Sequence, residues 1–260
     1  MINKVPACIR TLLVALIAVA TAACAGSSKT PQIVLVAGAT GQTGQQIVKH
    51  LQQEGFHVRA LVRDPLKVND QQLGPDTEFV VGDVKDRATM AAAMTGASAV
   101  ISSVGARGKD GPDRPEMVDY EGVRNLVDAA KAAKVRQFVL VSSRGVTQPD
   151  NPLNRMFGNI LVWKLKGEDY LRASGLAYTI VRPGGLLNEP GGKSDLAFEQ
   201  GDRKFSGPLP IAREDVAMVC VQALKIPEAK FRTFEVSSAE GPPVTNWKAK
   251  FASLKPDTKR

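Results

Sequence analysis

Residues 32–53 constrain the fold more than any other part of the chain. The apolar run from Ile33 to Ala37 has the length of a strand, and such a run is typical of a parallel strand buried on both faces. The glycine-rich segment 38–44 follows directly, and residues 42–53 then carry apolar residues at helical spacing. A strand, a tight turn and a helix in this order predict the first unit of a parallel α/β sheet.

The same alternation continues along the chain. Further strands are expected at 58–62, 78–81, 99–101, 138–141, 178–181 and 232–236, and further helices at 86–94, 116–133, 156–173, 213–224 and 245–253, with a long loop over 186–210. With 260 residues, 43% of them apolar, the chain is long enough for one large domain with a sizeable core. We therefore predict a doubly wound parallel sheet in a single domain over residues 32–254, followed by a tail at 255–260.

The N-terminus has the features of an export signal. Lys4 and Arg10 precede an apolar run, and small residues lead to Cys24, where a bacterial lipoprotein would be acylated. The run is shorter than the roughly 20 apolar residues that a bilayer span needs. We interpret residues 1–24 as a signal peptide or lipoprotein signal and residues 25–31 as a linker. An uncleaved anchor and a mis-assigned start codon are the alternatives, since Thr21 is unusual three residues before an acylated cysteine.

This interpretation has two consequences. The protein is expected to be membrane-associated through a lipid anchor at Cys24, with the cytoplasmic and periplasmic sides both open. Of the three cysteines, Cys8 would be removed and Cys24 acylated, so no pair would remain for a disulfide. Cys220 lies in an apolar helical context and is predicted to be a small core residue.

The glycine-rich segment is the first candidate binding site. In doubly wound sheets, ligands bind outside the carboxyl ends of the strands. Glycines there allow a tight turn and a close approach of the backbone to a pyrophosphate, which the N–H groups of the following helix also bind. The predicted cradle residues are Gly38, Thr40, Gly41, Gln42, Thr43 and Gly44. The alternative is a glycine-rich turn that binds no ligand.

The ends of the second and third strands suggest which dinucleotide is bound. Arg63 suits the 2′-phosphate of NADP(H), whereas an NAD(H) site would place a carboxylate there, so NADP(H) is favoured over NAD(H). An ion pair of Arg63 with the adjacent Asp64 is the alternative. Asp83 can accept a hydrogen bond from the adenine amino group while Val84 packs on the ring. Asp83 or Asp86 could instead cap the next helix.

Later strand ends complete the predicted site. Ser103 and Gly105 are small enough to leave room for the nicotinamide ribose, and the loop 106–115 that follows is expected to be mobile and to lie on the substrate side. Ser143 follows the fifth strand. The sixth strand leads into Pro183, Gly184 and Gly185, which we also assign to the cofactor site.

Several segments together resemble the atypical short-chain dehydrogenase/reductase superfamily, and more narrowly its NAD(P)H-binding, NmrA-like branch. The similar segments are 36–41 (VAGATG), 60–65 (ALVRDP), 151–154 (NPLN), 159–164 (NILVWK) and 178–186 (YTIVRPGGL). The resemblance covers residues 32 to about 253. It implies bound NADP and a single Rossmann-like domain with a small C-terminal substrate lobe.

The chain departs from the resembling family at one catalytic position. Active members use Tyr-x-x-x-Lys with a serine after the fifth strand. Ser143 and Lys164 match the serine and the lysine, and are the candidate catalytic residues, but the tyrosine position holds Ile160. Isoleucine cannot act as a general acid. Lys164 could still bind the ribose hydroxyls of the cofactor.

Two functions follow from these observations. The first is an NADPH-dependent oxidoreductase of unknown substrate, and the alternative is a non-catalytic NADP(H)-binding redox sensor or assembly factor. The net charge of +8 is scattered rather than clustered, which disfavours nucleic acid as a partner. No cluster of His, Cys and Asp has the spacing of a metal site, so we expect no metal. A dinucleotide is the expected partner, and the substrate or protein partner stays open.

Overall fold

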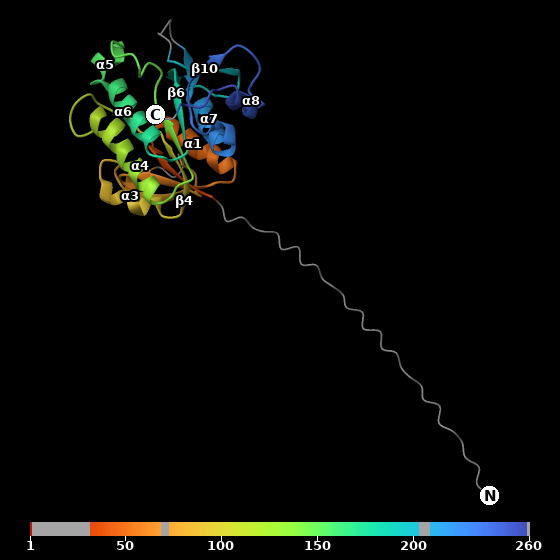
Figure 1. The fold of residues 1–260 in the computed structure, drawn as a ribbon. Helices are drawn as coiled ribbons and strands as arrows, with labels where there is room; N and C mark the ends of the chain where they lie inside the picture. Colours follow the sequence, from red (N-terminus) through yellow and green to blue (C-terminus); the bar gives the residue numbers. More distant parts are fainter. Residues whose placement is uncertain (2–31, 69–72, 203–208, 259–260) are drawn as a thin grey trace. The chain divides into compact units, whose positions relative to one another are not determined.

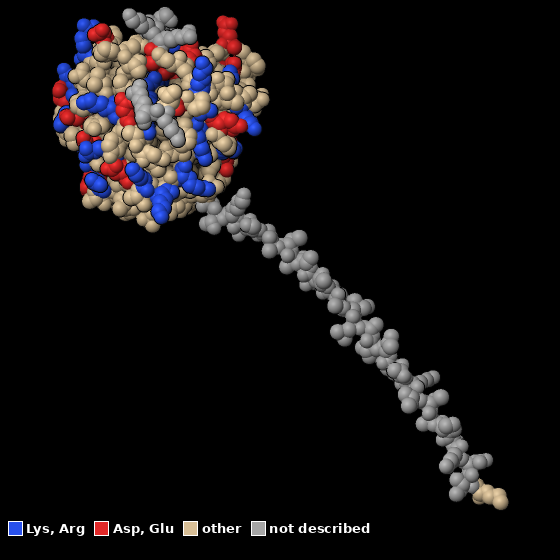
Figure 2. Space-filling view, viewed as in Figure 1, with Lys and Arg blue, Asp and Glu red and all other residues tan. Residues whose placement is uncertain are grey.

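The computed structural model describes Met1 and residues 32–68, 73–202 and 209–258. The predicted signal, the linker at 25–31 and the proposed acylation site Cys24 lie outside the described residues, apart from Met1. The chain from Pro31 onwards forms one compact unit. Within the described ranges, none of the helices combines the length and hydropathy that a bilayer span requires. Figure 2 shows Lys and Arg side chains spread over the visible face of the domain, with Asp and Glu side chains among them.

A central eight-stranded sheet has the strand order β3-β2-β1-β4-β5-β6-β10-β8 (Figure 1). The strands are β1 (Ile33–Ala37), β2 (His57–Val62), β3 (Glu78–Val81), β4 (Ala97–Ser102), β5 (Gln137–Val141), β6 (Tyr178–Pro183), β10 (Arg232–Ala239) and β8 (Asp195–Glu199). All neighbouring strands of this sheet are parallel except β8, which is antiparallel to β10. The predicted doubly wound, Rossmann-like parallel sheet is therefore confirmed, and β8 adds one antiparallel strand at its edge.

Helices cover both faces of the sheet (Figure 1). Their bounds are α1 (Gln42–Gln53), α3 (Arg87–Met94), α4 (Val123–Ala132), α5 (Pro152–Met156), α6 (Ile160–Ala173), α7 (Arg213–Lys225) and α8 (Trp247–Ala252). In β1, Val34 and Val36 belong to the hydrophobic core under α1 and α7, whereas Leu35 and Ala37 belong to the core under α3 and α4. Alternate side chains of one apolar run thus fill two cores, which explains why β1 has no polar face.

Two of the predicted helices have a different form. The expected helix at 156–173 is divided into α5 and α6, because Gly158 and Asn159 both have left-handed backbone angles, with φ of 60° and 58°. The expected helix at 116–133 begins as a π-helical segment, Glu116–Gly122, and continues as α4. A π-helical turn shifts the register of the side chains and often occurs at functional sites.

The expected loop at 186–210 contains β structure. It includes part of β7 (Gly185–Leu187), the whole of β8, and the first residue of β9 (Pro210–Ala212), with β7 and β9 paired in a separate small sheet. Strand β8 is stabilised by its contacts: Leu196 is buried, and the ring of Phe198 stacks on that of Phe234 at 4.6 Å between centroids. These pairings join distant segments, so short-range sequence patterns do not reveal them.

The C-terminus and Cys220 also have defined environments. Asp257, in the predicted tail, accepts hydrogen bonds from the Tyr178 hydroxyl at 2.9 Å and from the Thr233 amide at 3.1 Å. This carboxylate therefore fixes the end of the chain to β6 and β10. Cys220 is fully buried in α7, which confirms its predicted place in the core.

Candidate functional site

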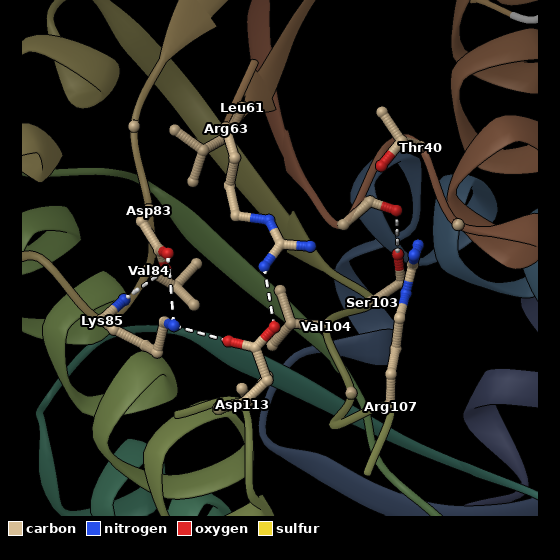
Figure 3. Close-up of a pocket in the computed structure, with 15 residues that line it drawn as sticks. Thr40, Leu61, Arg63, Asp83, Val84, Lys85, Ser103, Val104, Arg107 and Asp113 are labelled. Atoms are coloured by element: carbon tan, nitrogen blue, oxygen red, sulfur yellow. Dashed lines mark hydrogen bonds and ion pairs between the residues drawn. The ribbon is translucent and has the colours of Figure 1, made fainter. Parts of the chain in front are cut away.

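The strand order reverses between β1 and β4, and a pocket lies at the carboxyl ends of the strands on both sides of this point. Such a reversal is where doubly wound sheets bind their ligands. The pocket is lined by Gly38, Thr40, Gly41, Leu61, Arg63, Gly82, Asp83, Val84, Lys85, Ser103, Val104, Gly105, Arg107, Asp113 and Val118. We call it the first pocket. It brings together eight of the predicted cofactor residues from four different strand ends, as Figure 3 illustrates.

The glycine turn depends on the absence of side chains. Gly38 has φ of +83°, and a Cβ there would lie 2.9 Å from the carbonyl carbon of Ser103. A Cβ on buried Gly44 would collide with the carbonyl oxygen of Gly38. The Gly41 amide closes the turn by donating to that same oxygen at 3.0 Å. The turn is thus held close to both β4 and α1, and a small residue is required at each contact.

The N-terminus of α1 fits an anionic ligand. Its N-cap is Gly41, which has no side chain to accept from the helix amides, and its first turn contains no acidic residue. The first-turn N–H groups and the helix dipole therefore remain available to a phosphate. Gln42 and Thr43 stand in this first turn, although their side chains do not line the first pocket.

Two cations and one carboxylate meet at the ends of β2 and β3 in the first pocket (Figure 3). Arg63 donates from Nη1 to Oδ2 of Asp113 at 2.9 Å, and Lys85 donates from Nζ to Oδ1 of the same carboxylate at 2.5 Å. The hydrogen bond from Lys85, followed by that from Arg63, lowers the pKa of Asp113 below its ordinary value. Arg63 therefore pairs with Asp113, whereas the adjacent Asp64 accepts from the Leu66 amide at 3.1 Å.

Asp83 and Val84 stand at the end of β3, as the sequence predicted. Oδ1 of Asp83 accepts from the backbone amide of Lys85 at 3.0 Å, while Asp86 caps α3 by accepting from the Ala88 amide at 3.0 Å. Of the two candidate caps, Asp86 is therefore the residue that caps α3. Asp83 and Val84 remain in the pocket lining, where a carboxylate beside an apolar side chain suits a purine.

The loop at 106–115 extends from the first pocket to the α5–α6 junction. Arg107 and Asp113 line the first pocket, and Asp113 is paired to the ends of β2 and β3. Lys109 lies at the junction, since a Cβ built on Gly158 would be 2.6 Å from its carbonyl oxygen. The place of the loop on the substrate side stays a prediction. Arg107 points from this loop towards the glycine-rich turn in Figure 3. Charge pairing between distant segments determines this position, and sequence periodicity carries no information about it.

Lys164 lies beside the end of β4. Its Nζ is 2.7 Å from Oδ1 of Asp119, and it would be 3.9 Å from a Cβ built on Gly105. Asp119 is 1% exposed, and its other oxygen accepts from the Ala106 amide at 3.0 Å. The π-helical segment supplies Asp119, so one buried carboxylate orients both the lysine and the start of the 106–115 loop.

The remaining predicted site residues line a second pocket. Ser143, Pro183, Gly184 and Gly185 lie there, together with Arg144, Gly145, Thr147, Gln148, Pro149, Asp150, Asn151, Pro152 and Leu153 from the segment between β5 and α5. The Ser143 hydroxyl donates to the Arg144 carbonyl at 3.0 Å. The structure thus brings Pro183, Gly184 and Gly185 to Ser143 rather than to the glycine turn.

A network of buried ion pairs and hydrogen bonds holds the segment that lines the second pocket. Arg182 donates to Glu168 at 2.6 Å and to Glu235 at 3.0 Å, and burial raises the pKa of Glu235. Glu235 accepts from the Asp202 amide at 3.1 Å, and the Asp202 carboxylate accepts from the Gly145 amide at 2.6 Å. This chain of contacts connects the sheet to the β5–α5 segment.

Neither the position of the family's catalytic tyrosine nor the rest of the first turn of α6 carries a hydroxyl group. Ile160 is the first residue of α6 and is half-buried. Tyr170 donates to Asp128 at 2.7 Å, and this hydrogen bond raises the pKa of its phenol. The ring of Tyr120 stacks on that of Trp163 at 6.0 Å. Both tyrosines are thus engaged in other contacts.

Sequence reasoning missed four charged residues near the first pocket. Lys85 directly follows the predicted pair Asp83-Val84, so its place at a strand end was a usable signal. Arg107, Asp113 and Asp119 had none, because a loop fold and a π-helical turn bring them to the site. Among the residues that the structure describes, no group of three or more His, Cys, Asp or Glu side chains could hold a metal ion.

The fold and the first pocket together define a dinucleotide-binding protein of the Rossmann type. A family model for NAD(P)H-binding proteins matches residues 38–227, and the chain therefore belongs to the NAD(P)H-binding family. This match and the solved structures that the chain resembles agree with the expected atypical short-chain dehydrogenase/reductase superfamily.

Individual relatives show how the family varies. Sanguinarine reductase of Eschscholzia californica is 38% identical over 262 residues, covering 85% of this chain and 95% of that protein. The photosystem II assembly factor Ycf39 of Trieres chinensis is 31% identical over 223 residues, covering 80% and 64%. A solved structure described as a putative NAD-dependent epimerase/dehydratase from Bacillus halodurans is 28% identical, with a TM-score of 0.74 and coverage of 86% and 100%.

Proposed function

We propose that the protein is an NADPH-dependent reductase. The observation that carries this proposal is the first pocket, which joins an uncapped helix N-terminus, a glycine turn and the cations Arg63 and Lys85. The helix and the turn suit a pyrophosphate, and the two cations suit a 2′-phosphate. NADP(H) is therefore the preferred cofactor.

The residues between the two pockets suit hydride transfer. The cofactor, when bound, supplies the hydride. Lys164, oriented by Asp119, would bind the hydroxyls of the nicotinamide ribose. Ser143 would donate a hydrogen bond to the reacting oxygen of a substrate in the second pocket, whose prolines, glycines and Leu153 suit a largely apolar molecule. The relative named sanguinarine reductase supports a reductase role for this chain.

Ile160 restricts the proton transfer. A hydride acceptor such as a quinone can take its proton from water, so the reaction does not need a tyrosine at this position. Substrates whose reduction needs a strong general acid in the site would react slowly. We therefore place quinones before simple carbonyl compounds as substrates.

Steady-state kinetics test this proposal. NADPH oxidation by the full chain is followed with a panel of quinones and carbonyl compounds, and the Lys164→Ala variant is compared with the matched surface variant Lys166→Ala. We expect turnover with quinones that Lys164→Ala removes and Lys166→Ala retains. Tight NADPH binding without turnover for any acceptor would overturn the reductase proposal.

A non-catalytic NADP(H) sensor or assembly factor is the second candidate, and Ile160 is the observation that favours it. The relative Ycf39, named as a photosystem II assembly factor, supports the same direction. Under this function, cofactor binding would change the protein's partners without turnover. Affinity capture of partners with NADPH and with NADP⁺ tests it, and an identical set in both states would exclude redox sensing.

We further propose that residues 1–24 are an export signal and that Cys24 carries a lipid. The support is the basic, apolar and small-residue pattern of the sequence. Labelling with a palmitate analogue, with Cys24→Ser as the control, tests the lipid. Accessibility of the domain to protease in intact cells then decides which side of the membrane it occupies.

A further inference from the structure

The charge cluster of Arg63, Lys85 and Asp113 has the geometry of an anion site that a carboxylate fills. Each oxygen of the Asp113 carboxylate accepts from a different cation, one at the end of β2 and one just beyond β3. Asp113 enters from the opposite direction, on the 106–115 loop (Figure 3). A phosphate has more acceptor oxygens and more charge than a carboxylate, so it can satisfy the same two cations.

The exposure of this cluster allows a ligand to replace one partner of an ion pair. The side chains of Arg63, Asp113 and Lys85 are 55%, 36% and 21% exposed. In the Arg63–Asp113 pair both side chains are more than a third exposed, and such a pair contributes only about 1 kcal/mol or less to stability, so a ligand can replace Asp113 on Arg63 at little cost.

The charge balance requires Asp113 to leave. Oδ2 of Asp83 is 3.5 Å from Nζ of Lys85, so two cations face two carboxylates and the local charge is close to zero. A doubly charged phosphate entering this neutral group would meet Asp113 as a like charge. If Asp113 withdraws, the phosphate meets a net positive site and two strong donors.

We propose that Lys85 is a second ligand of the cofactor's 2′-phosphate beside Arg63, and that Asp113 occupies the position of this phosphate until the cofactor displaces it. Lys85 then determines the selection of NADP(H) over NAD(H), and Asp113 weakens the binding of the phosphorylated cofactor by competing with it. This inference rests on the proposed NADP(H) site but does not require turnover.

Binding of two adenosine fragments by the full chain tests the inference. Isothermal titration with 2′,5′-ADP and with 5′-AMP isolates the 2′-phosphate, because the fragments differ in that group alone. We expect Lys85→Gln to weaken 2′,5′-ADP binding by about tenfold and to change 5′-AMP binding by less than about twofold. We expect Asp113→Asn to strengthen 2′,5′-ADP binding several-fold and to leave 5′-AMP binding unchanged.

Matched variants provide the controls. Lys67→Gln removes an exposed lysine that pairs with Asp64 outside the first pocket, and Asp110→Asn removes an exposed carboxylate from the same loop. Neither control should change the ratio of the two affinities. Circular dichroism confirms that each variant is folded.

Three results would overturn the inference. They are a wild-type chain that binds both fragments equally, a Lys85→Gln variant that loses both fragments equally or neither, and an Asp113→Asn variant with weaker 2′,5′-ADP binding. Failure of the reductase proposal would appear differently, as absent NADPH oxidation with the fragment preference intact.

Discussion

The two pockets at the same edge of the sheet are built in different ways. The first pocket, at the ends of β1 to β4, consists of a glycine turn, a helix N-terminus and charged side chains. The second, at the ends of β5 and β6, consists largely of an irregular segment held in place by Asp202 and a buried ion network. The first pocket presents charged and hydrogen-bonding groups that suit one class of ligand. The second pocket is defined mainly by the backbone conformation of the β5–α5 segment. The first pocket therefore determines its ligand more narrowly than the second.

The ion network under the second pocket gives the largest expected effect. Arg182→Met leaves Glu168 and Glu235 buried without their shared cation, and should reduce the free energy of unfolding by about 3–5 kcal/mol. Urea unfolding measures this loss, and exposed Arg136→Met serves as the control. A loss below about 1 kcal/mol would mean that the network does not support this region.

The glycine turn of the first pocket gives the next effect. In Gly38→Ala, the Cβ must displace the backbone of Ser103, so NADPH affinity should fall by about 100-fold, or about 2.7 kcal/mol. Gly55 has a similar φ of +77°, but no atom lies within 4 Å of a Cβ built there. Gly55→Ala therefore carries the backbone strain alone and should retain NADPH binding. Equal losses of affinity in both variants would remove the close-packing argument.

Lys164 lies beside Gly105 of the first pocket, and the effect of its removal should depend on the ligand. Lys164→Ala is expected to weaken NADPH binding by about tenfold, since a charge-assisted contact to the ribose is lost. Binding of 2′,5′-ADP should be unchanged, because that fragment lacks the nicotinamide ribose. Fluorescence titration of NADPH and calorimetry of the fragment provide the comparison. A similar loss for both ligands would place Lys164 outside a nicotinamide-ribose site.

The contact between α1 and α7 gives the smallest effect and depends on pH. The hydrogen bond from Lys49, followed by that from the Gly191 amide, lowers the pKa of Glu214 below 4.5. A lowered carboxyl pKa contributes stability that is present in full above the unfolded pKa and is lost as the pH falls through the folded pKa.

Glu214→Gln should therefore cost about 1 kcal/mol at neutral pH and less at about pH 3, because this stability is lost progressively as the pH falls below the unfolded pKa and through the lower folded pKa. Chemical unfolding at both pH values measures the difference. A constant difference at the two pH values would show that the ionised form of Glu214 is not the source of this stability.

The sequence revealed the parts of the molecule that depend on local patterns. The apolar run at β1, the glycine turn and α1 were predicted at their observed positions, because burial on both faces and the requirement for small residues leave a direct mark on the sequence. The placement of Asp113 and Asp119 was not predicted. It depends on how the 106–115 loop folds back and on one π-helical segment, and both are determined by contacts between distant residues.

The second pocket was harder to predict from the sequence, because its form also depends on contacts between distant residues. Pro183, Gly184 and Gly185 were assigned to the cofactor because they follow a strand, but the structure groups them with Ser143 in the second pocket. Strand β8 was expected as part of a loop, because only Leu196 and Phe198 alternate in its five residues and their partners, such as Phe234, are distant in the sequence. Strand ends can thus be located from sequence more readily than the pocket into which each one opens.

The 106–115 loop is fastened at both ends, and this can be read by proteolysis. The Ala106 amide is held by Asp119, and the Asp113 carboxylate is held by Arg63 and Lys85. Between these points lie Arg107 and Lys109, and trypsin cleaves after such residues, whereas the bond after Arg114 resists trypsin because Pro115 follows. If a ligand displaces Asp113 as proposed, the loop loses its contacts with Arg63 and Lys85, and tryptic cleavage after Arg107 and Lys109 should become faster.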